Sequence, residues 1–204
     1  MKRLNTFFKI MLITLSVGAV SAAWSQAYPN KPLKIVVPFG AGGVADLTAR
    51  TVAQKLGENL GQSIVIENKP GAGGVVATDA VAKSSPDGYT LLLMSNATAV
   101  SAGLFKTLPY DAEKDLLPVS ILGTFDIAIV VSQESKFASL ADLLSYAKAN
   151  PGKLNIGSIN VGSTQNLAAE LFKSTAGIDA QVVPFNGTPA VLTALRGGQI
   201  DVGV

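Results

Sequence analysis

The sequence predicts an α/β protein built from two similar units, each with a parallel sheet. Apolar runs typical of buried strands alternate with helical patterns along the chain, which implies parallel strands joined by right-handed crossovers. In addition, each unit opens in the same way, with a strand, a bend of small residues and a helix. The two bends lie at residues 39–43 and 158–163. Two such bends could face each other across a cleft and hold a carboxylate at each end; two ordinary crossovers are the alternative.

The first bend is the most informative stretch. Residues 33–37 are mostly β-branched and lie between Pro32 and Pro38, so they are expected to form a buried strand. A helix is expected next, because apolar residues recur at three- and four-residue steps from Ala45 to Leu60. The glycines between them expose the backbone, and the helix start adds unpaired amides and partial positive charge. This arrangement predicts an anion site without a cationic side chain; a tight turn capped by Asp46 is the simpler alternative.

The remaining elements follow in order. Further strands are expected at residues 63–67, 89–94, 154–157 and 181–184, and helices at 76–83, 140–147, 167–172 and 191–195. Strand-like runs at 119–122 and 126–131 are expected to lead out of the first unit. Ligands of parallel sheets bind beyond the carboxyl ends of the strands, which in the first unit places loops 39–43, 68–74 and 95–98 at the site.

Residues 1–27 have the composition of a cleavable Sec-type signal peptide. Lys2, Arg3 and Lys9 precede an apolar run at 10–23, which is shorter than the roughly 20 residues of a membrane span, and cleavage is expected after Ala27. We therefore expect an exported, periplasmic protein. This segment holds three of the 16 basic residues and none of the 14 acidic ones, so the mature chain has a net charge of −1. That balance, without a basic stripe, argues against nucleic acid as a partner.

The chain has no cysteine and no histidine. Disulfides, zinc–thiolate sites, Ser-His-Asp triads and Cys-His pairs are therefore excluded within this sequence. Its acidic residues are scattered, with no spacing that indicates a metal site or a pair of catalytic carboxylates. We expect a binding protein that needs no metal or cofactor, not an enzyme; an enzyme that uses a Ser-Lys pair or carboxylates alone is the alternative, although no motif marks one.

Six blocks together resemble a known family. They are IVVPFGAGGVAD at 35–46, VIENKPGAGG at 65–74, PDGYTL at 86–91, LPYD at 108–111, AKANPGKL at 147–154 and GGQID at 197–201. In this order they are similar to the Bug (TctC-like) family, the periplasmic substrate-binding receptors of tripartite tricarboxylate transporters. The resemblance covers essentially the whole mature chain.

The resemblance implies a type II periplasmic-binding-protein fold, with two α/β lobes around a cleft. Lobe 1 is expected at 28–118 and lobe 2, with crossing strands, at 119–204. Family members continue beyond the position of Val204, so lobe 1 is expected to lack its C-terminal return and the chain to be C-terminally truncated. The implied ligand is a small di- or tricarboxylate, and the implied partners are membrane permease subunits. The receptor itself is expected to be a monomer.

The resemblance also implies ligand-binding residues. Phe39 would line the cleft, Gly42 and Gly43 would bring amides to a carboxylate, and Asp46 would orient the loop or accept a hydrogen bond. On the far side, hydroxyls and amides of lobe 2 would hold the other end. The full expected set is Phe39, Gly42, Gly43, Asp46, Gly73, Ser95, Asn96, Ser158, Gly162, Ser163 and Thr164. The chain departs from the family pattern at Gly40–Ala41, where prolines are usual, and at Asn160 and Asn166, where glycine and histidine are frequent.

Two other functions stay open. Residues 40–45 also fit the dinucleotide fingerprint G-x-G-x-x-[GA], and Glu67 lies where a ribose-binding acid would follow, which suggests an exported NAD-binding oxidoreductase. Alternatively, the same carboxylate receptor could serve a sensor kinase instead of a permease.

Overall fold

The computed structural model describes residues 28–204, so the predicted signal peptide at 1–27 lies outside the described part. Residues 31–204 form one compact unit. Within the described residues, no helix combines the length and the apolar character that a membrane crossing requires.

The N-terminal half contains a parallel sheet of three strands. They are β1 (Leu33–Val37), β2 (Ile64–Asn68) and β3 (Thr90–Leu92), in the order β2-β1-β3. Val36 at the centre pairs with Glu67 on one side and with Leu92 on the other. All three strands were expected from the sequence, and their parallel direction is confirmed.

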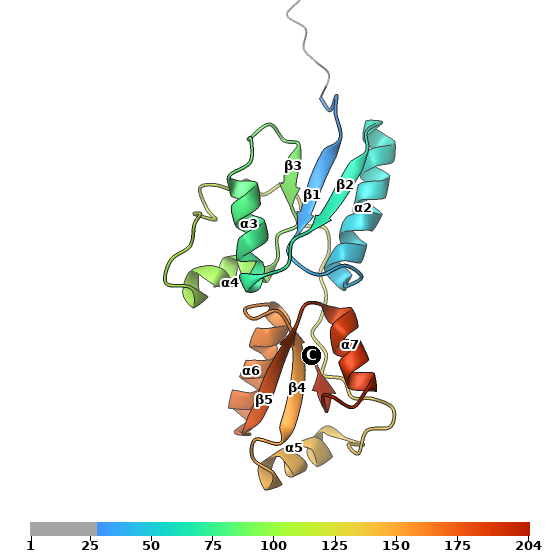
Figure 1. Cartoon of the computed structure of the whole chain (residues 1–204), viewed down its shortest axis with the longest axis vertical. Coiled ribbons are helices and arrows are strands. Elements are labelled where there is room, and N and C mark those ends of the chain that lie inside the picture. The colour runs from blue at the N-terminus through green and yellow to red at the C-terminus, as the bar shows by residue number, and fades with distance from the viewer. Residues whose placement is uncertain (1–27) are drawn as a thin grey trace, which may run out of the picture. The chain divides into compact units, whose positions relative to one another are not determined.

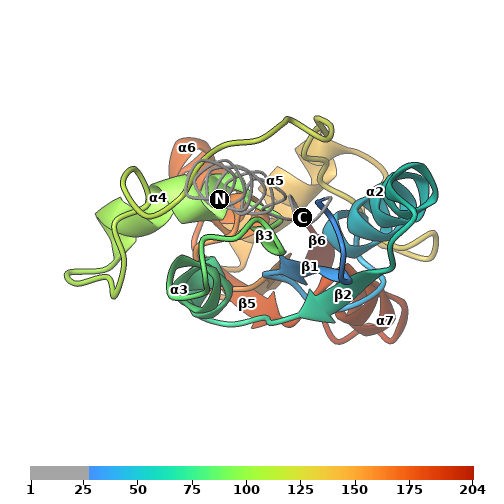
Figure 2. The same ribbon diagram turned by 90° about the horizontal axis from the view of Figure 1, so that it is seen from above.

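Helices cover both faces of this sheet. Side chains of a strand alternate between its faces, and on β1 Ile35 and Val37 pack in one cluster with Ala49 of α2 (Val44–Leu60). Val36 instead packs with Ala77 of α3 (Val75–Ala82). The two helices therefore lie on opposite sides of the sheet, as both views show (Figures 1 and 2).

Two short helical segments were not expected. A single 3-10 turn, η1 (Ala72–Gly74), leads from the second glycine bend into α3. A further helix, α4 (Asn96–Leu104), begins where the sequence predicts the loop 95–98, and Ser95 is its N-cap residue. The composition of α4, rich in alanine, glycine, serine and threonine, gives no clear apolar face, so periodicity could not reveal it.

The C-terminal half repeats the design. Its parallel sheet has the order β5-β4-β6, with β4 (Leu154–Ile159), β5 (Ala180–Phe185) and β6 (Val202–Gly203). Ile156 packs with Ala169 of α6 (Thr164–Ala176), whereas Ile159 clusters with Val191 of α7 (Thr188–Arg196). A further helix, α5 (Leu140–Ala149), packs Leu143 against the α6 side.

The segment that joins the halves corrects one expectation. Residues 119–122 and 126–131 were predicted as strands, but only Val130 pairs, in an antiparallel bridge with Gly203. Val119 and Ile121 are 85% and 86% exposed. An apolar run forms a strand only where a neighbouring backbone accepts its hydrogen bonds, and among residues 28–204 this segment has that partner only at Val130.

Candidate functional site

A cavity of about 360 Å³ lies where three strands end. Gly71 and Ala72 follow β2, Asn160 and Val161 follow β4, and Pro184, Phe185 and Asn186 form the end of β5 and the residue after it. The cavity thus takes residues from both halves and lies at the carboxyl ends of parallel strands, the usual position of a ligand in α/β proteins. Its volume is within the range of small-molecule pockets.

Each lining segment leads directly into a helix. Gly71 and Ala72 precede or begin η1, which runs into α3, while Asn160 precedes α6 and Asn186 precedes α7. The amino end of a helix carries partial positive charge and unpaired amides. None of the described residues that line the cavity has a charged side chain. The electrostatic preference for an anion would therefore come from backbone groups rather than from arginine or lysine.

The two bends expected from the sequence share one internal arrangement. In the first, the Gly42 amide donates to Oδ2 of Asp46 over 2.9 Å. In the second, the Gly162 amide donates to Oδ1 of Asn166 over 3.1 Å. Both glycines have a positive φ, +81° and +82°, which favours glycine. A side chain four residues on thus fixes each bend.

Asp46 is the centre of a larger network. It is 2% exposed, its Oδ2 accepts from Nε of Arg50 at 2.9 Å, and its Oδ1 accepts from Nδ2 of Asn68 at 2.9 Å. Asn68 Nδ2 also donates to the Phe39 carbonyl at 3.0 Å. The hydrogen bond from Arg50, helped by those from Gly42 and Asn68, lowers the pKa of Asp46 to about 2, although burial opposes this shift. Asp46 is therefore ionised and occupied in holding the bend.

Arg50 and Asn68 were not among the expected site residues. The i to i+4 spacing of Asp46 and Arg50 on one helix could have indicated the ion pair. The bridge from Asn68 depends on the pairing of β1 with β2, which joins residues far apart in sequence.

The second bend uses uncharged groups. Oγ of Ser163 accepts from the Asn166 amide at 3.1 Å and donates to the Ile159 carbonyl at 2.6 Å. Nδ2 of Asn166 donates to Oγ of Ser158 at 3.2 Å, and both serines are fully buried. The Ser158 and Ser163 hydroxyls, expected to reach a ligand, thus already have partners within the bend.

The Gly42 and Gly162 amides are engaged in the same way, because each donates to a side chain of its own bend. Phe39 is buried in the hydrophobic cluster that also contains Ile159 and Val191, so its ring joins the two halves. Contact between these groups and a ligand stays a prediction.

Three further residues of the expected set lie at helix starts. Gly43 is the N-cap of α2, and Thr164 is the first residue of α6. Asn96 is exposed at the start of α4. None of the three lines the cavity at the strand ends.

Each of the two bends contacts a loop of the opposite half. The Gly40 amide donates to the Asn186 carbonyl at 3.2 Å, so the first bend meets the loop before α7. The second bend meets the loop before α3, where a Cβ added to Gly73 would lie 2.9 Å from the Val161 carbonyl oxygen. The cavity lies beside this second contact. Gly73, an expected site residue, thus permits the close approach of the two halves.

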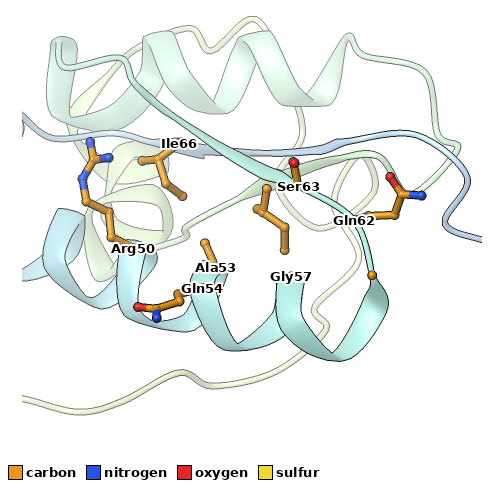
Figure 3. Close-up of a pocket in the computed structure, with 9 residues that line it drawn as sticks. Arg50, Ala53, Gln54, Gly57, Gln62, Ser63 and Ile66 are labelled. Atoms are coloured by element: carbon orange, nitrogen blue, oxygen red, sulfur yellow. The ribbon is translucent and has the colours of Figure 1, made fainter.

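A second hollow, of about 620 Å³, lies between α2 and β2 and takes its lining from the N-terminal half alone (Figure 3). Arg50, Gln54, Gly57 and Gln62 line it with parts of β2. It lies along the length of α2, and the charged side chain in its lining, Arg50, is already paired with Asp46 at 2.9 Å. Glu67, the acid of the dinucleotide alternative, pairs with Lys34 at 3.1 Å and with Lys69 at 3.0 Å.

The two α/β lobes have the fold of periplasmic binding proteins. A family model described as "Tripartite tricarboxylate transporter family receptor" matches residues 48–204. The chain therefore belongs to this family, which also includes the Bug proteins, and the resemblance found in the sequence is confirmed.

Known relatives agree with this assignment. Protein BugT of Bordetella pertussis is 37% identical over an alignment of 206 positions, which covers all of this chain and 63% of BugT. The structure of MatC from Rhodopseudomonas palustris with bound malate is 34% identical, with a TM-score of 0.80 over 86% of this chain and 60% of MatC. Periplasmic binding protein BugD is 30% identical, with a TM-score of 0.77 over 86% of this chain and 58% of BugD. The chain thus spans somewhat less than two thirds of each of these proteins.

Proposed function

We propose that this protein is a periplasmic receptor that binds a small dicarboxylate or tricarboxylate between its two halves. The observation that carries the proposal is the cavity at the ends of β2, β4 and β5, around which α3, α6 and α7 begin. Converging helix starts favour negative charge, and an uncharged lining leaves the carboxylate to be held by neutral donors. The likeness to MatC with bound malate supports the same ligand class.

The proposed mechanism is closure of the two lobes around the ligand. The crosswise contacts, from Gly40 to Asn186 and from Gly73 to Val161, belong to a closed arrangement. A ligand that contacts both halves stabilises this arrangement over an open one, because it binds the two forms with different affinity. Membrane permease subunits of a tripartite tricarboxylate transporter would recognise the closed form and accept the ligand. On this account the protein is exported to the periplasm, acts as a monomer and is not an enzyme.

A thermal-shift scan of the purified protein tests the proposal. Malate, succinate, adipate and citrate are compared with NAD, each at the same concentration. A ligand that binds only the folded state raises the melting temperature by mass action. We expect at least one carboxylate to raise it and NAD to leave it unchanged; titration calorimetry then gives the affinity.

A rise with NAD and with none of the carboxylates would contradict the receptor proposal and favour the dinucleotide alternative. A melting temperature that no carboxylate changes, even far above millimolar concentration, would also count against the receptor proposal.

A further inference from the structure

Asn160 presents a buried hydrogen-bond donor without a partner beside the cavity. It is 8% exposed, and it lines the cavity with Gly71, Ala72 and Asn186. Within residues 28–204, its Nδ2 has no hydrogen-bond partner, although solvent does not reach it either. A buried donor of this kind costs free energy unless some group accepts its hydrogen.

The backbone of Asn160 is fixed by two hydrogen bonds. The Asn160 amide donates to the Phe185 carbonyl over 2.9 Å, and the Asn160 carbonyl accepts from the Ser163 amide at 2.9 Å. Both partners belong to ordered elements, since Phe185 ends β5 and Ser163 is the N-cap of α6. The backbone of Asn160, and with it the root of the side chain, is therefore held at the cavity wall.

We propose that Asn160 is a specificity-determining residue, which donates from Nδ2 to an acceptor oxygen of the bound ligand. This inference rests on the proposed function and names the ligand more closely. The donor is a neutral amide at the end of a strand, in a cavity whose lining is uncharged. The amides at the helix starts attract the carboxylates of the ligand. This leaves the side-chain amide of Asn160 to a neutral oxygen, such as a hydroxyl or keto group, carried between the two carboxylates. The ligand class is a hydroxy- or keto-dicarboxylate.

Access follows from the position of the cavity between the two halves. Gly71 and Ala72 come from the N-terminal half, and Asn160 comes from the C-terminal half. Separation of the halves would uncover Nδ2, and closure on the ligand would give it a partner. In the closed protein, Nδ2 of Asn160 would therefore have a hydrogen-bond partner only when a ligand is bound. A ligand with an acceptor oxygen at this point would bind more tightly than one without it.

Malate and succinate are the probes, because they share a carbon chain and differ by one hydroxyl. Calorimetry on the purified protein should give malate the higher affinity, by roughly 2- to 10-fold, the range of a single neutral hydrogen bond. Asn160→Ala should remove this preference, and Asn160→Asp should weaken both ligands by placing a carboxylate beside them. Asn155→Ala, at the other end of β4, is the control and should keep the preference.

A second readout needs no ligand. Because Nδ2 is unpartnered, Asn160→Ala should leave the melting temperature of the unliganded protein equal or higher. Truncation to alanine also removes packing, so Asn160→Leu, which keeps the volume of the side chain, is measured beside it. A lower melting temperature in both variants would mean that Nδ2 has a partner within the protein, and it would overturn the inference. An unchanged ratio of malate to succinate affinity in Asn160→Ala would overturn it as well, while leaving the receptor function intact. Failure of every carboxylate to bind would overturn the proposed function itself.

Discussion

Asp46 and Asn166 hold equivalent positions in the two halves and accept from the same group, the amide of the glycine four residues before them. The N-terminal bend is held by a carboxylate and the C-terminal bend by an amide. The difference follows from the next turn of each helix. Arg50 pairs with Asp46 at 2.9 Å, whereas the corresponding residue after Asn166 is Glu170. The charged side chain, Asp46, thus lies beside a cation, whereas the neutral side chain, Asn166, is followed by an acidic residue.

Asp46→Asn should keep the bend but remove its pH dependence. The folded-state pKa of Asp46 is about 2, below the ordinary 3.8, so its contribution to stability is present above pH 4 and lost as the pH falls towards 2. We expect the variant to be less stable by about 2 kcal/mol near neutral pH, and the gap to close under acid conditions. Urea unfolding at several pH values between about 7 and 2 measures this gap. A gap that stays constant with pH would contradict the assignment.

The reverse exchange, Asn166→Asp, should be more harmful. It places a carboxylate at a site that is only 8% exposed and has Glu170 one turn further on in place of an arginine. It also removes the donor to Ser158 Oγ. We expect a loss of about 3 kcal/mol or more in the free energy of unfolding near neutral pH, with partial recovery on acidification as the new carboxyl takes up a proton. Equal stability of Asn166→Asp and wild type would show that the bend tolerates charge.

Gly73→Ala should weaken ligand binding through the contact between the halves. The new Cβ would meet the Val161 carbonyl oxygen at 2.9 Å, at a backbone φ of +62° that disfavours alanine. The halves would have to separate, so closure on the ligand would be impaired, and we expect a loss of carboxylate affinity of roughly 10-fold or more in calorimetry. Gly103→Ala is the matched control, since its added Cβ meets no atom within 4 Å. Similar affinities for both variants would exclude this role of Gly73.

Gly157→Ala tests the core of the C-terminal half. Its Cβ would overlap Cδ1 of Ile200 and lie 3.3 Å from Phe185 Cε2 and 3.4 Å from Val191 Cγ1. Overpacking of this kind costs about 1–3 kcal/mol, and chemical denaturation should show a loss in that range. The double variant Gly157→Ala with Ile200→Val should recover part of it. No loss in the single variant would mean that α7 and β4 are less tightly packed.

The repeated architecture was predictable from the sequence because its signals are local. Leu33–Val37 is a mostly apolar run, and strands were expected there and at residues 154–157, each followed by a bend. The helices after the bends show clear periodicity. Features that depend on distant partners were harder to predict. Residues 119–131 look like strands but pair only at Val130, because no other neighbouring backbone within residues 28–204 meets them.

The site was predictable in its position but not in its detail. The sequence placed the ligand loops at the carboxyl ends of the strands, and the cavity lies there. Its lining, at residues 71–72, 160–161 and 184–186, was not in the expected set of ligand-binding residues. These residues come together only when β2, β4 and β5 meet across the two halves, which no local pattern encodes.

The proposed function depends on a carboxylate binding in the cavity at the strand ends. Backbone amide chemical shifts can be recorded by NMR during a titration with malate. We expect the largest changes at residues 71–72, 160–161 and 185–186, which line the cavity. Changes confined to the hollow between α2 and β2, around Arg50, Gln54 and Gln62, would place the ligand elsewhere and contradict it.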